Sequence, residues 1–317
     1  MTYLAYQVQE LDGTFIGDVK TLETPALQED HILIKVEYSS LNYKDALAAT
    51  GVKGVVKQYP FTPGIDSAGT VIKTSSDDFS VGDKVVLTGY KMGMSVNGGF
   101  GEIVHAPAKW AVKLPANLTL LHSMEIGTAG LTAAASVKKL EDAKISKELP
   151  VLVSGATGGV GSLAINILNK LGYTVHALTG KTYEEDTIKS MGAIELINRD
   201  KFLEDGIKPL DKAIYSAAID TVGGDILSKM LSMVNNNGVV TSCGNVAGAK
   251  FTSSVFPFIL RGISLHGIDS AESSIELKKT LWNKLANEWL VSLESQTKIV
   301  SLNNVGPEII KILDGNQ

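Results

Sequence analysis

The sequence predicts an α/β protein in which a β-rich domain accompanies a doubly wound parallel sheet. Three observations lead to this prediction. Short β segments fill the first hundred residues, strand and helix candidates alternate from Val151 to Ser242, and a glycine-rich turn joins the first strand of that alternation to its helix. The length of 317 residues suits two domains of ordinary size.

The first region is rich in Val, Ile and Tyr, interrupted by Gly, Pro and Asp. Helical periodicity is weak there apart from Tyr43–Ala49. This pattern predicts a barrel-like or sandwich-like antiparallel domain. Its expected strands are Tyr3–Val8, His31–Tyr38, Gly64–Thr74, Gly82–Thr88 and Gly101–Pro107.

The pattern changes at Ser123–Leu140, which carries Ala, Leu and Val at helical spacing. The alternation that follows predicts a parallel sheet with helices on both faces. Its expected strands are Val151–Ser154, Thr174–Leu178, Glu195–Ile197, Ala213–Asp220 and Gly238–Ser242. The expected helices are Ser162–Leu171, Glu184–Met191 and Asp225–Val234, followed by Ile275–Leu290 and Pro307–Leu313. We place one domain at 123–261 and the other at 1–122 together with 262–317.

Composition narrows the functional class. With 44% hydrophobic residues, 20% charged residues and a net charge of −5, the chain is typical of a globular protein and has no basic footprint for nucleic acid or an anionic membrane. The single cysteine, Cys243, excludes an intramolecular disulfide and a four-cysteine zinc site, and indicates a reducing compartment. Neither a signal-like N-terminus nor an apolar run of about 20 residues is present, so we expect a cytoplasmic location.

The strongest chemical signal is the segment VLVSGATGGVGSLAINILNKLG, 151–172. Glycines after a strand allow a tight turn and a close approach of a diphosphate, and the following helix directs its N-terminal amides at that anion. The segment therefore predicts a Rossmann-type dinucleotide site, unless the glycines serve only the packing of helix on sheet. A P-loop is excluded because no Gly-Lys-Ser/Thr ends the turn. The expected contacts are Thr157, Gly158, Gly159, Val160 and Gly161.

The end of the second strand predicts which dinucleotide binds. NAD enzymes usually place a carboxylate there on the ribose hydroxyls, whereas this chain has Thr179, Gly180 and Lys181. A hydroxyl, a flexible glycine and a cation suit a 2′-phosphate, so we expect NADPH, with Arg199 as a second cation. The alternative is that Lys181 and Arg199 are ordinary exposed side chains.

The strand ending at Ser242 leads to Asn245, which we expect on the nicotinamide side of the crevice. Neighbouring Cys243 has no basic residue or second cysteine close in the sequence to lower its pKa. We therefore interpret Cys243 as a structural residue.

Several segments spread over most of the chain carry a family resemblance. They are SSLNYKDALA (39–48), FTPGIDSAGTV (61–71), GTAGLTAA (127–134), SGATGGVGS (154–162), AIDTVGG (218–224) and FPFILRGISLHGIDS (256–270). Together they resemble the medium-chain dehydrogenase/reductase superfamily, and within it the zinc-free quinone-oxidoreductase-like branch of the YhdH/YhfP type, which includes acryloyl-CoA reductases. The resemblance implies a GroES-like β-rich catalytic domain beside the Rossmann-type domain.

Metal chemistry is not expected. The zinc alcohol dehydrogenases of this superfamily carry Gly-His-Glu where this chain has Gly64-Ile65-Asp66-Ser67, and the five histidines are scattered without ligand spacing. Without a Lewis acid, oxidation of an alcohol loses its usual route. Reduction of an already polarised C=C bond remains available.

The resemblance places Asn42 and Tyr43 beside the nicotinamide. Tyr43 is expected to bind substrate or cofactor, and either to protonate the α-carbon or only to shape the pocket while water supplies the proton. Asn42 either polarises the substrate carbonyl or fixes the turn. Asp45 is expected to pair with Lys44 or to cap the helix.

The hydroxyl of Thr128 is expected either to meet the nicotinamide carboxamide or to cap a helix. Ile259 and Ser270 are cofactor-binding candidates on the resemblance alone. The resemblance also implies a homodimer, formed through an edge strand of the nucleotide-binding sheet.

The first functional interpretation is NADPH-dependent reduction of an α,β-unsaturated acyl thioester such as acryloyl-CoA. Basic side chains for CoA phosphates would come from Lys44, Lys53, Lys57, Lys91 or Arg261. The second interpretation is a quinone or enone reductase. The third is a cofactor-binding sensor or RNA-binding protein with little turnover, which the acidic charge disfavours.

Overall fold

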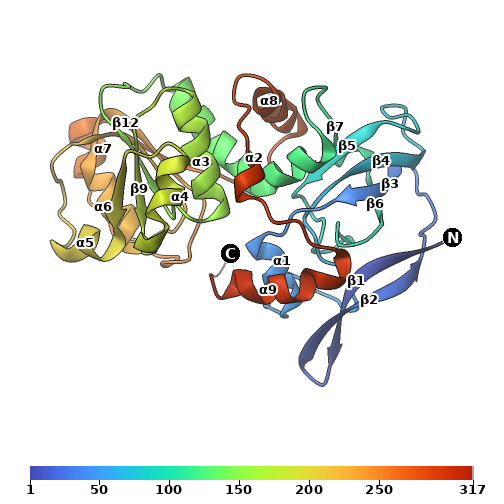
Figure 1. Ribbon diagram of the computed structural model, residues 1–317. Coiled ribbons are helices and arrows are strands. Elements are labelled where there is room, and N and C mark those ends of the chain that lie inside the picture. The colour runs from blue at the N-terminus through green and yellow to red at the C-terminus, as the bar shows by residue number, and fades with distance from the viewer. Residues whose placement is uncertain (316–317) are drawn as a thin grey trace. The chain divides into compact units, whose positions relative to one another are not determined.

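The computed structural model describes residues 1–315, which form two compact units (Figure 1). Of the described residues, the first unit contains Met1–Thr128, Ala271–Asn287 and 292–315, and the second contains Ala129–Ser270 and Glu288–Val291. The second unit thus extends to Ser270, beyond the residue 261 expected from the sequence. The physical reason is that the strand Ser264–Gly267 pairs with the sheet of this unit.

The first unit is built on an antiparallel five-stranded sheet with the order β6-β3-β4-β5-β7. A separate antiparallel hairpin is formed by β1 and β2, which turn at Asp12 and Gly13. The strands are β1 (Thr2–Leu11), β2 (Thr14–Glu23), β3 (His31–Tyr38), β4 (Asp66–Thr74), β5 (Lys84–Thr88), β6 (Ile103–Pro107) and β7 (Ala111–Lys113). The predicted antiparallel β-rich domain is therefore confirmed.

Alternation along these strands explains how the sheet buries one face. Ile32 and Ile34 on β3 and Val85 and Leu87 on β5 point into one apolar cluster and are almost fully buried. The helices of this unit are α1 (Tyr43–Ala49), α8 (Ile275–Ala286) and α9 (Val305–Leu313). Helices α1 and α9 share a second apolar cluster with the hairpin.

The segment that returns to the first unit is held by a buried lysine. Lys278 on α8 is fully buried, and its ammonium donates to the carbonyl oxygens of Thr88 at 2.6 Å and Ala271 at 2.9 Å. The same nitrogen lies 3.3 Å from the centre of the Tyr90 ring, in cation–π geometry. This contact joins α8 to the end of β5.

The second unit contains a six-stranded parallel sheet with the order β10-β9-β8-β11-β12-β13. This is the 3-2-1-4-5-6 order of a Rossmann sheet, in which the strand order reverses between the first and fourth strands, here β8 and β11. The strands are β8 (Val151–Ser154), β9 (Val175–Thr179), β10 (Glu195–Asn198), β11 (Tyr215–Asp220), β12 (Val234–Ser242) and β13 (Ser264–Gly267). The predicted Rossmann-type domain is confirmed.

The helices of the second unit connect these strands. They are α3 (Gly159–Lys170), α4 (Glu185–Ser190), α5 (Arg199–Glu204), α6 (Gly224–Met233) and α7 (Phe256–Arg261). Helix α2 (Leu120–Asp142) crosses from one unit to the other along the chain, and Gly127 interrupts it with φ 51° and ψ −159°. Short 3-10 helices lie at Ala108–Trp110, Thr182–Glu184, Glu294–Gln296 and Leu302–Asn304.

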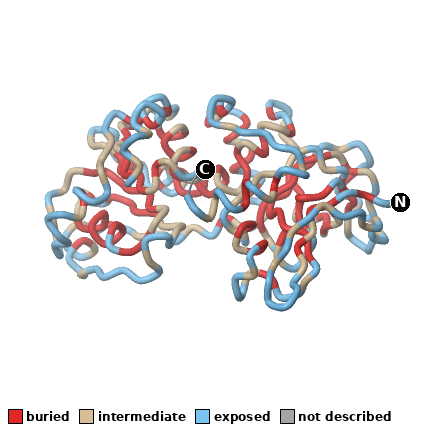
Figure 2. The backbone as a smooth tube through the Cα atoms, turned by 60° about the horizontal axis from the view of Figure 1, so that its bottom comes forward, coloured by how far each residue is buried: buried red, intermediate tan, exposed pale blue. Residues whose placement is uncertain are grey.

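Buried residues, red in Figure 2, form the interior of each unit. In the second unit every residue of β8 and β11 is buried, as expected for central strands covered on both faces. Leu152, Ala218 and Val240 from three neighbouring strands contribute to its apolar core. The carboxyl ends of these strands are therefore rigidly supported.

Candidate functional site

The turn after β8 can be formed only by small residues. Gly155 has φ +61°, and a Cβ at that position would lie 2.2 Å from the hydroxyl oxygen of Thr221. A Cβ on Gly161 would lie 2.2 Å from the carbonyl oxygen of Gly155. Contacts this short do not occur for real Cβ atoms, so the first turn of α3 packs on the end of β8 only because both residues are glycine.

The N-terminus of α3 leaves its amides open to an anion. The N-cap residue Gly158 has extended backbone geometry and no side chain to accept from the first turn. Gly158 and Gly159 are exposed, whereas Gly161 is buried against the turn. The first amides and the partial positive charge of a twelve-residue helix therefore face outward at the carboxyl edge of the sheet. This arrangement fits the diphosphate of a dinucleotide, with Thr157 and Val160 beside it in the turn.

The end of β9 brings the predicted phosphate-binding residues together. Asn198 on β10 pairs with Thr179 on β9, which places the start of α5 next to the turn. The guanidinium carbon of Arg199 would lie 3.2 Å from a Cβ on Gly180, so its plane covers this glycine. The Thr179 hydroxyl accepts from the amide of Lys181 at 3.1 Å. The Arg199 guanidinium thus lies against Gly180, the residue that precedes Lys181, although a helix and a strand separate Arg199 from Lys181 in the sequence.

A cavity of about 580 Å³ opens at the carboxyl ends of β12 and β13. It is lined by Ser242, Cys243, Gly244, Asn245, Gly267, Ile268 and Asp269. Burial raises the pKa of the Cys243 thiol to about 12, and the negative charge of Asp220 adds to the shift. The thiol stays protonated at neutral pH, so this geometry agrees with a structural cysteine.

The two candidates that rest on resemblance alone are not among the residues that line this cavity, although Ser270 directly follows Asp269, which does. Ser270 is buried, and its hydroxyl shares a 2.5 Å hydrogen bond with the hydroxyl of Thr132 on α2. Ile259 lies on α7 with 68% of its surface exposed. Both residues stay predicted cofactor contacts on the resemblance.

In the first unit, Asn42 and Thr128 converge on one buried carboxylate. Asp66, the first residue of β4, is fully buried. Its Oδ2 atom accepts from the side-chain amide of Asn42 at 2.8 Å and from the backbone amide of Thr128 at 2.7 Å. The Thr128 hydroxyl donates to Oδ1 at 2.5 Å, and the Ser40 hydroxyl donates to Oδ2 at 2.5 Å. Burial raises the pKa of Asp66, and these hydrogen bonds oppose the rise.

This geometry bears on the roles expected of the two residues. The Asn42 amide nitrogen directs its hydrogens at Asp66 and, at 3.4 Å, at the Ser40 carbonyl, so its contacts support a role in fixing the turn. The Thr128 hydroxyl donates its hydrogen bond to Asp66, so toward another partner it can act only as an acceptor. Tyr43, the first residue of α1, is 45% exposed and reaches solvent.

Asp45 lies one helical turn from Asn42 and is also fully buried. Its Oδ2 accepts from the Asn42 amide at 2.8 Å, and its Oδ1 accepts from the amides of Gly64 and Ile65 at 3.1 and 2.8 Å. The expected capping of the helix by Asp45 is confirmed by the first contact. Burial, followed by the charge of Asp66, raises the pKa of Asp45 to about 7.

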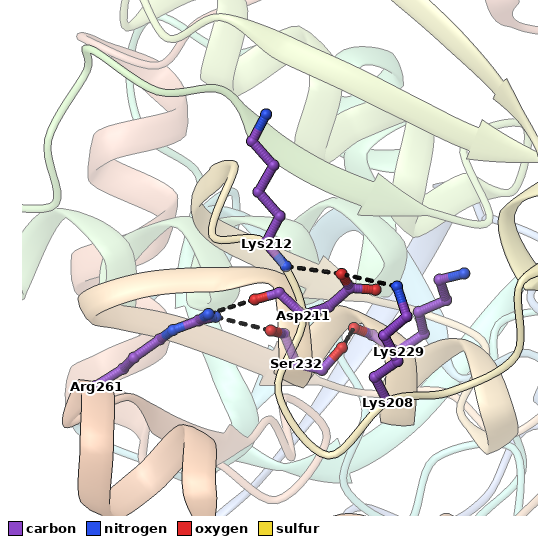
Figure 3. A network of polar contacts seen from close by, with 6 residues as sticks. All are labelled: Lys208, Asp211, Lys212, Lys229, Ser232 and Arg261. Carbon is purple, nitrogen blue, oxygen red and sulfur yellow. Dashed lines mark hydrogen bonds and ion pairs between the residues drawn. The ribbon is translucent and has the colours of Figure 1, made fainter.

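Two of the basic residues considered for CoA phosphates are engaged elsewhere. The Arg261 guanidinium donates to the carbonyl oxygens of Ser232 at 2.7 Å and of Asp211 (Figure 3), and to that of Val234 at 3.0 Å. These bonds anchor α7 to the end of α6. Lys91 forms an ion pair with Glu272 at 2.9 Å. These three carbonyl contacts give Arg261 a structural role, and its expected contact with a CoA phosphate stays a prediction.

Asp66 is a residue that the sequence interpretation did not count among the site residues. The signal was present in Gly64-Ile65-Asp66-Ser67, where the zinc dehydrogenases carry a metal ligand and a glutamate. A carboxylate placed inside an apolar strand segment needs several donors. In the part of the chain that the structure describes, no three His, Cys, Asp or Glu side chains gather closely enough to hold a metal ion.

Comparison with known proteins agrees with these features. Residues 28–116 match the alcohol dehydrogenase GroES-like domain, and residues 159–287 match the family described as zinc-binding dehydrogenase. The chain is 43% identical to the putative quinone oxidoreductase YhfP of Bacillus subtilis over 85% of its length and 82% of that protein. It is 38% identical to the probable acrylyl-CoA reductase AcuI of Escherichia coli over 99% of its length and 96% of that protein.

Two solved structures have the same fold. The yhdH oxidoreductase of Salmonella enterica, crystallised in complex with NADP, has a TM-score of 0.94 at 37% identity, covering 100% of this chain and 97% of that one. Bacillus subtilis yhfP, crystallised with NAD bound, has a TM-score of 0.96 at 39% identity, covering 99% of this chain and 97% of that one. The chain therefore belongs to the medium-chain dehydrogenase/reductase superfamily, in the quinone-oxidoreductase-like branch of the YhdH/YhfP type.

Proposed function

We propose that this protein uses NADPH to reduce the C=C bond of an α,β-unsaturated acyl thioester such as acryloyl-CoA, without zinc. The observation that carries the proposal is the likeness over almost the whole chain to a protein named as a probable acrylyl-CoA reductase. Membership of an oxidoreductase family and the glycine turn at the switch point of the sheet support it.

The residues of the second unit fit a dinucleotide. The turn at Gly155 and the first amides of α3 would hold the diphosphate, while Arg199, which lies against Gly180, and the adjoining Lys181 would hold a 2′-phosphate. Bacillus subtilis yhfP was crystallised with NAD, so relatives of this chain are found with either nucleotide. We propose that Lys181 and Arg199 give this chain its preference for NADPH. Thr179 would support the same turn, and Asn245 on the cavity of about 580 Å³ would lie toward the nicotinamide.

The reaction needs a hydrogen-bond donor that stabilises the negative charge on the thioester oxygen, and a proton for the α-carbon. Bound NADPH would supply the hydride that adds to the β-carbon of the conjugated thioester. The pair of electrons released from the C=C bond moves toward the thioester oxygen, and the α-carbon then takes a proton. The exposed Tyr43 hydroxyl is our candidate to donate to the substrate, and Asn42 holds the start of α1 in place through Asp66. Thr128, Ile259 and Ser270 stay candidate cofactor contacts.

The test compares acceptors. Purified protein is mixed with NADPH and either acryloyl-CoA or a soluble quinone, and the loss of nicotinamide absorbance is followed. Oxidation with the thioester alone supports the proposal. Oxidation with the quinone alone would favour the second candidate, a quinone reductase, for which the likeness to YhfP is the specific observation. Binding of NADPH without turnover on either acceptor would favour a cofactor-binding protein.

Independence from metal is part of the proposal. The absence of a group of three suitable side chains among residues 1–315 supports it. We expect prolonged treatment with a chelator, followed by desalting, to leave the rate of NADPH oxidation unchanged. Activity that is lost with the chelator and restored by zinc would contradict this part.

We also propose a homodimer that works in the cytoplasm. Strand β13 forms one end of the six-stranded sheet. The neighbouring α7 and its N-cap residue expose apolar side chains, namely Val255, Phe256, Ile259 and Leu260. An apolar surface beside a sheet edge supports pairing of two copies. Within residues 1–315, no helix combines the length and apolar character that crossing a bilayer requires. Light scattering should give twice the chain mass, and Leu260→Asp should reduce it; a monomeric wild-type protein would contradict the dimer.

A further inference from the structure

A buried carboxylate lies at the point where the strand order of the second unit reverses. Asp220 is the last residue of β11 and is fully buried. Its neighbours in the sheet are β8, which ends at Ser154, and β12, which ends at Ser242. The three strands are parallel, so these three side chains meet at the same edge.

The carboxylate divides its two oxygens between the neighbouring strands. Oδ1 accepts from the Ser154 hydroxyl at 2.9 Å, and Oδ2 accepts from the Ser242 hydroxyl at 2.9 Å. Each oxygen also accepts from the Gly223 amide at 3.0 Å, and Oδ1 accepts from the Val222 amide at 3.2 Å. These donors are neutral, so the Asp220 carboxyl group joins the ends of the neighbouring strands through hydrogen bonds and not through an ion pair.

The first branch leads directly into the dinucleotide turn. Ser154 precedes Gly155, and its hydroxyl also accepts from the Thr221 amide at 2.9 Å. The Thr221 hydroxyl returns a hydrogen bond to the Ser154 carbonyl at 2.9 Å and fills the space where a Gly155 Cβ would lie. The position of the turn is thus fixed through residues that adjoin Asp220.

The second branch leads into the cavity at the ends of β12 and β13. Ser242 is one of its lining residues, followed by Cys243, Gly244 and Asn245. The Cys243 amide donates to the Asp220 carbonyl at 3.0 Å, and a Cβ on Gly244 would lie 1.8 Å from the Thr221 carbonyl oxygen. The lining therefore packs on the same two residues, Asp220 and Thr221, as the turn does.

We infer that Asp220 is a positioning residue that holds the diphosphate turn and the wall of the cavity in register, through Ser154 on one side and Ser242 on the other. The inference rests on the proposed binding of NADPH. It assigns separate tasks to the two serines: Ser154 serves the diphosphate end of the cofactor, and Ser242 serves its nicotinamide end.

The different roles inferred for Ser154 and Ser242 can be tested by comparing the binding of two ligands. ADP-ribose carries the diphosphate without a nicotinamide, whereas NADPH carries both. By calorimetry, Ser154→Ala should weaken both ligands about tenfold, and Ser242→Ala should weaken NADPH but change ADP-ribose less than twofold. Asp220→Asn should weaken both ligands and also lower kcat, because an amide cannot accept from both serines and from Gly223. Ser242→Thr, which keeps the hydroxyl, should restore wild-type binding.

Thr241→Val is the matched control. Thr241 precedes Ser242 on β12, is fully buried, and its hydroxyl has no hydrogen-bond partner. This variant should bind both ligands like the wild type, and thermal unfolding should show that each serine variant is folded. If the serine variants and Asp220→Asn bind both ligands as tightly as the wild type, the inference is wrong while the proposed function stands. If the wild type itself binds no NADPH, both are overturned.

Discussion

Thr128 gives both of its donors to the carboxylate of Asp66, its backbone amide to Oδ2 at 2.7 Å and its hydroxyl to Oδ1 at 2.5 Å. The preceding Gly127 makes this contact possible. A Cβ at that position would lie 2.5 Å from the Ser40 hydroxyl and 2.9 Å from Oδ2 of Asp66. The interruption of α2 at Gly127 therefore lets the chain approach the buried carboxyl group of Asp66 closely.

The first prediction concerns that pair. Thr128→Val removes the hydroxyl and leaves part of a buried carboxylate without its donor, so we expect a loss of roughly 1–3 kcal/mol in the free energy of unfolding. Thr128→Ser keeps the donor and should lose much less. Urea unfolding of the three proteins measures the difference. Equal losses in the two variants would show that the methyl group, and not the hydrogen bond, matters.

The second prediction concerns the dinucleotide turn. Gly161→Ala places a Cβ 2.2 Å from the Gly155 carbonyl oxygen if nothing moves, so the first turn of α3 must shift away from β8. We expect NADPH affinity to fall by more than tenfold, measured by quenching of protein fluorescence. Ser162→Ala, at the next position on the same helix, is the control and should bind normally. Normal binding by Gly161→Ala would show that the turn is not the diphosphate site.

The third prediction concerns cofactor choice. Lys181→Ala removes a cation beside Gly180, and we expect NADPH to bind at least tenfold more weakly, because a charge-assisted hydrogen bond contributes about 1.5–3 kcal/mol. NADH binding should change less than twofold. Lys170→Ala, at the C-terminal end of α3 and away from the glycine turn, should change the affinity for neither nucleotide. Equal weakening of both nucleotides in Lys181→Ala would refute the phosphate assignment.

The fourth prediction concerns pH. The pKa of Asp45 is about 7 in the folded protein, above its ordinary value of 3.8, so the folded state holds a proton that the unfolded state releases. The stabilisation is complete at acidic pH below the ordinary value and is lost as the pH rises through about 7. Between pH 5 and 7 we expect the free energy of unfolding to fall by roughly 1 kcal/mol per pH unit.

Urea unfolding at pH 5, 6 and 7 provides the measurement for Asp45. The Asp45→Asn variant has no titrating group at this position, so its stability should depend less on pH in the same window. The comparison removes contributions from the other acidic residues, which both proteins share. Parallel curves for the two proteins would show that Asp45 titrates outside this range.

Local signals predicted the nucleotide-binding unit well. The strand Val151–Ser154 agrees with the structure at both ends, because an apolar run followed by a glycine turn leaves one interpretation. Strand β2 was missed, although Asp12-Gly13, both with positive φ, is a strong hairpin signal. Strand β13 was missed because Ser264-Leu265-His266-Gly267 has little apolar character and is held by pairing with β12.

The candidate site was predictable only where its residues are close in sequence. The glycine turn and the Thr179-Gly180-Lys181 end are continuous segments, and their chemistry follows from local pattern. The Asp66 cluster gathers residues 40, 42, 66 and 128, and Asp220 gathers residues 154 and 242, so only the fold shows them together. For the same reason, the sequence did not show the internal contacts of Arg261, because its acceptors Ser232 and Asp211 lie far from it along the chain.

The raised pKa of the Cys243 thiol favours site-directed labelling of this protein at introduced cysteines. The chain has a single cysteine, and its raised pKa of about 12 leaves almost no thiolate at neutral pH. A maleimide dye or spin probe should therefore react with a newly introduced surface cysteine and leave the native one unmodified. Distance measurements between two such labels, one in each unit, would then need no cysteine-free background.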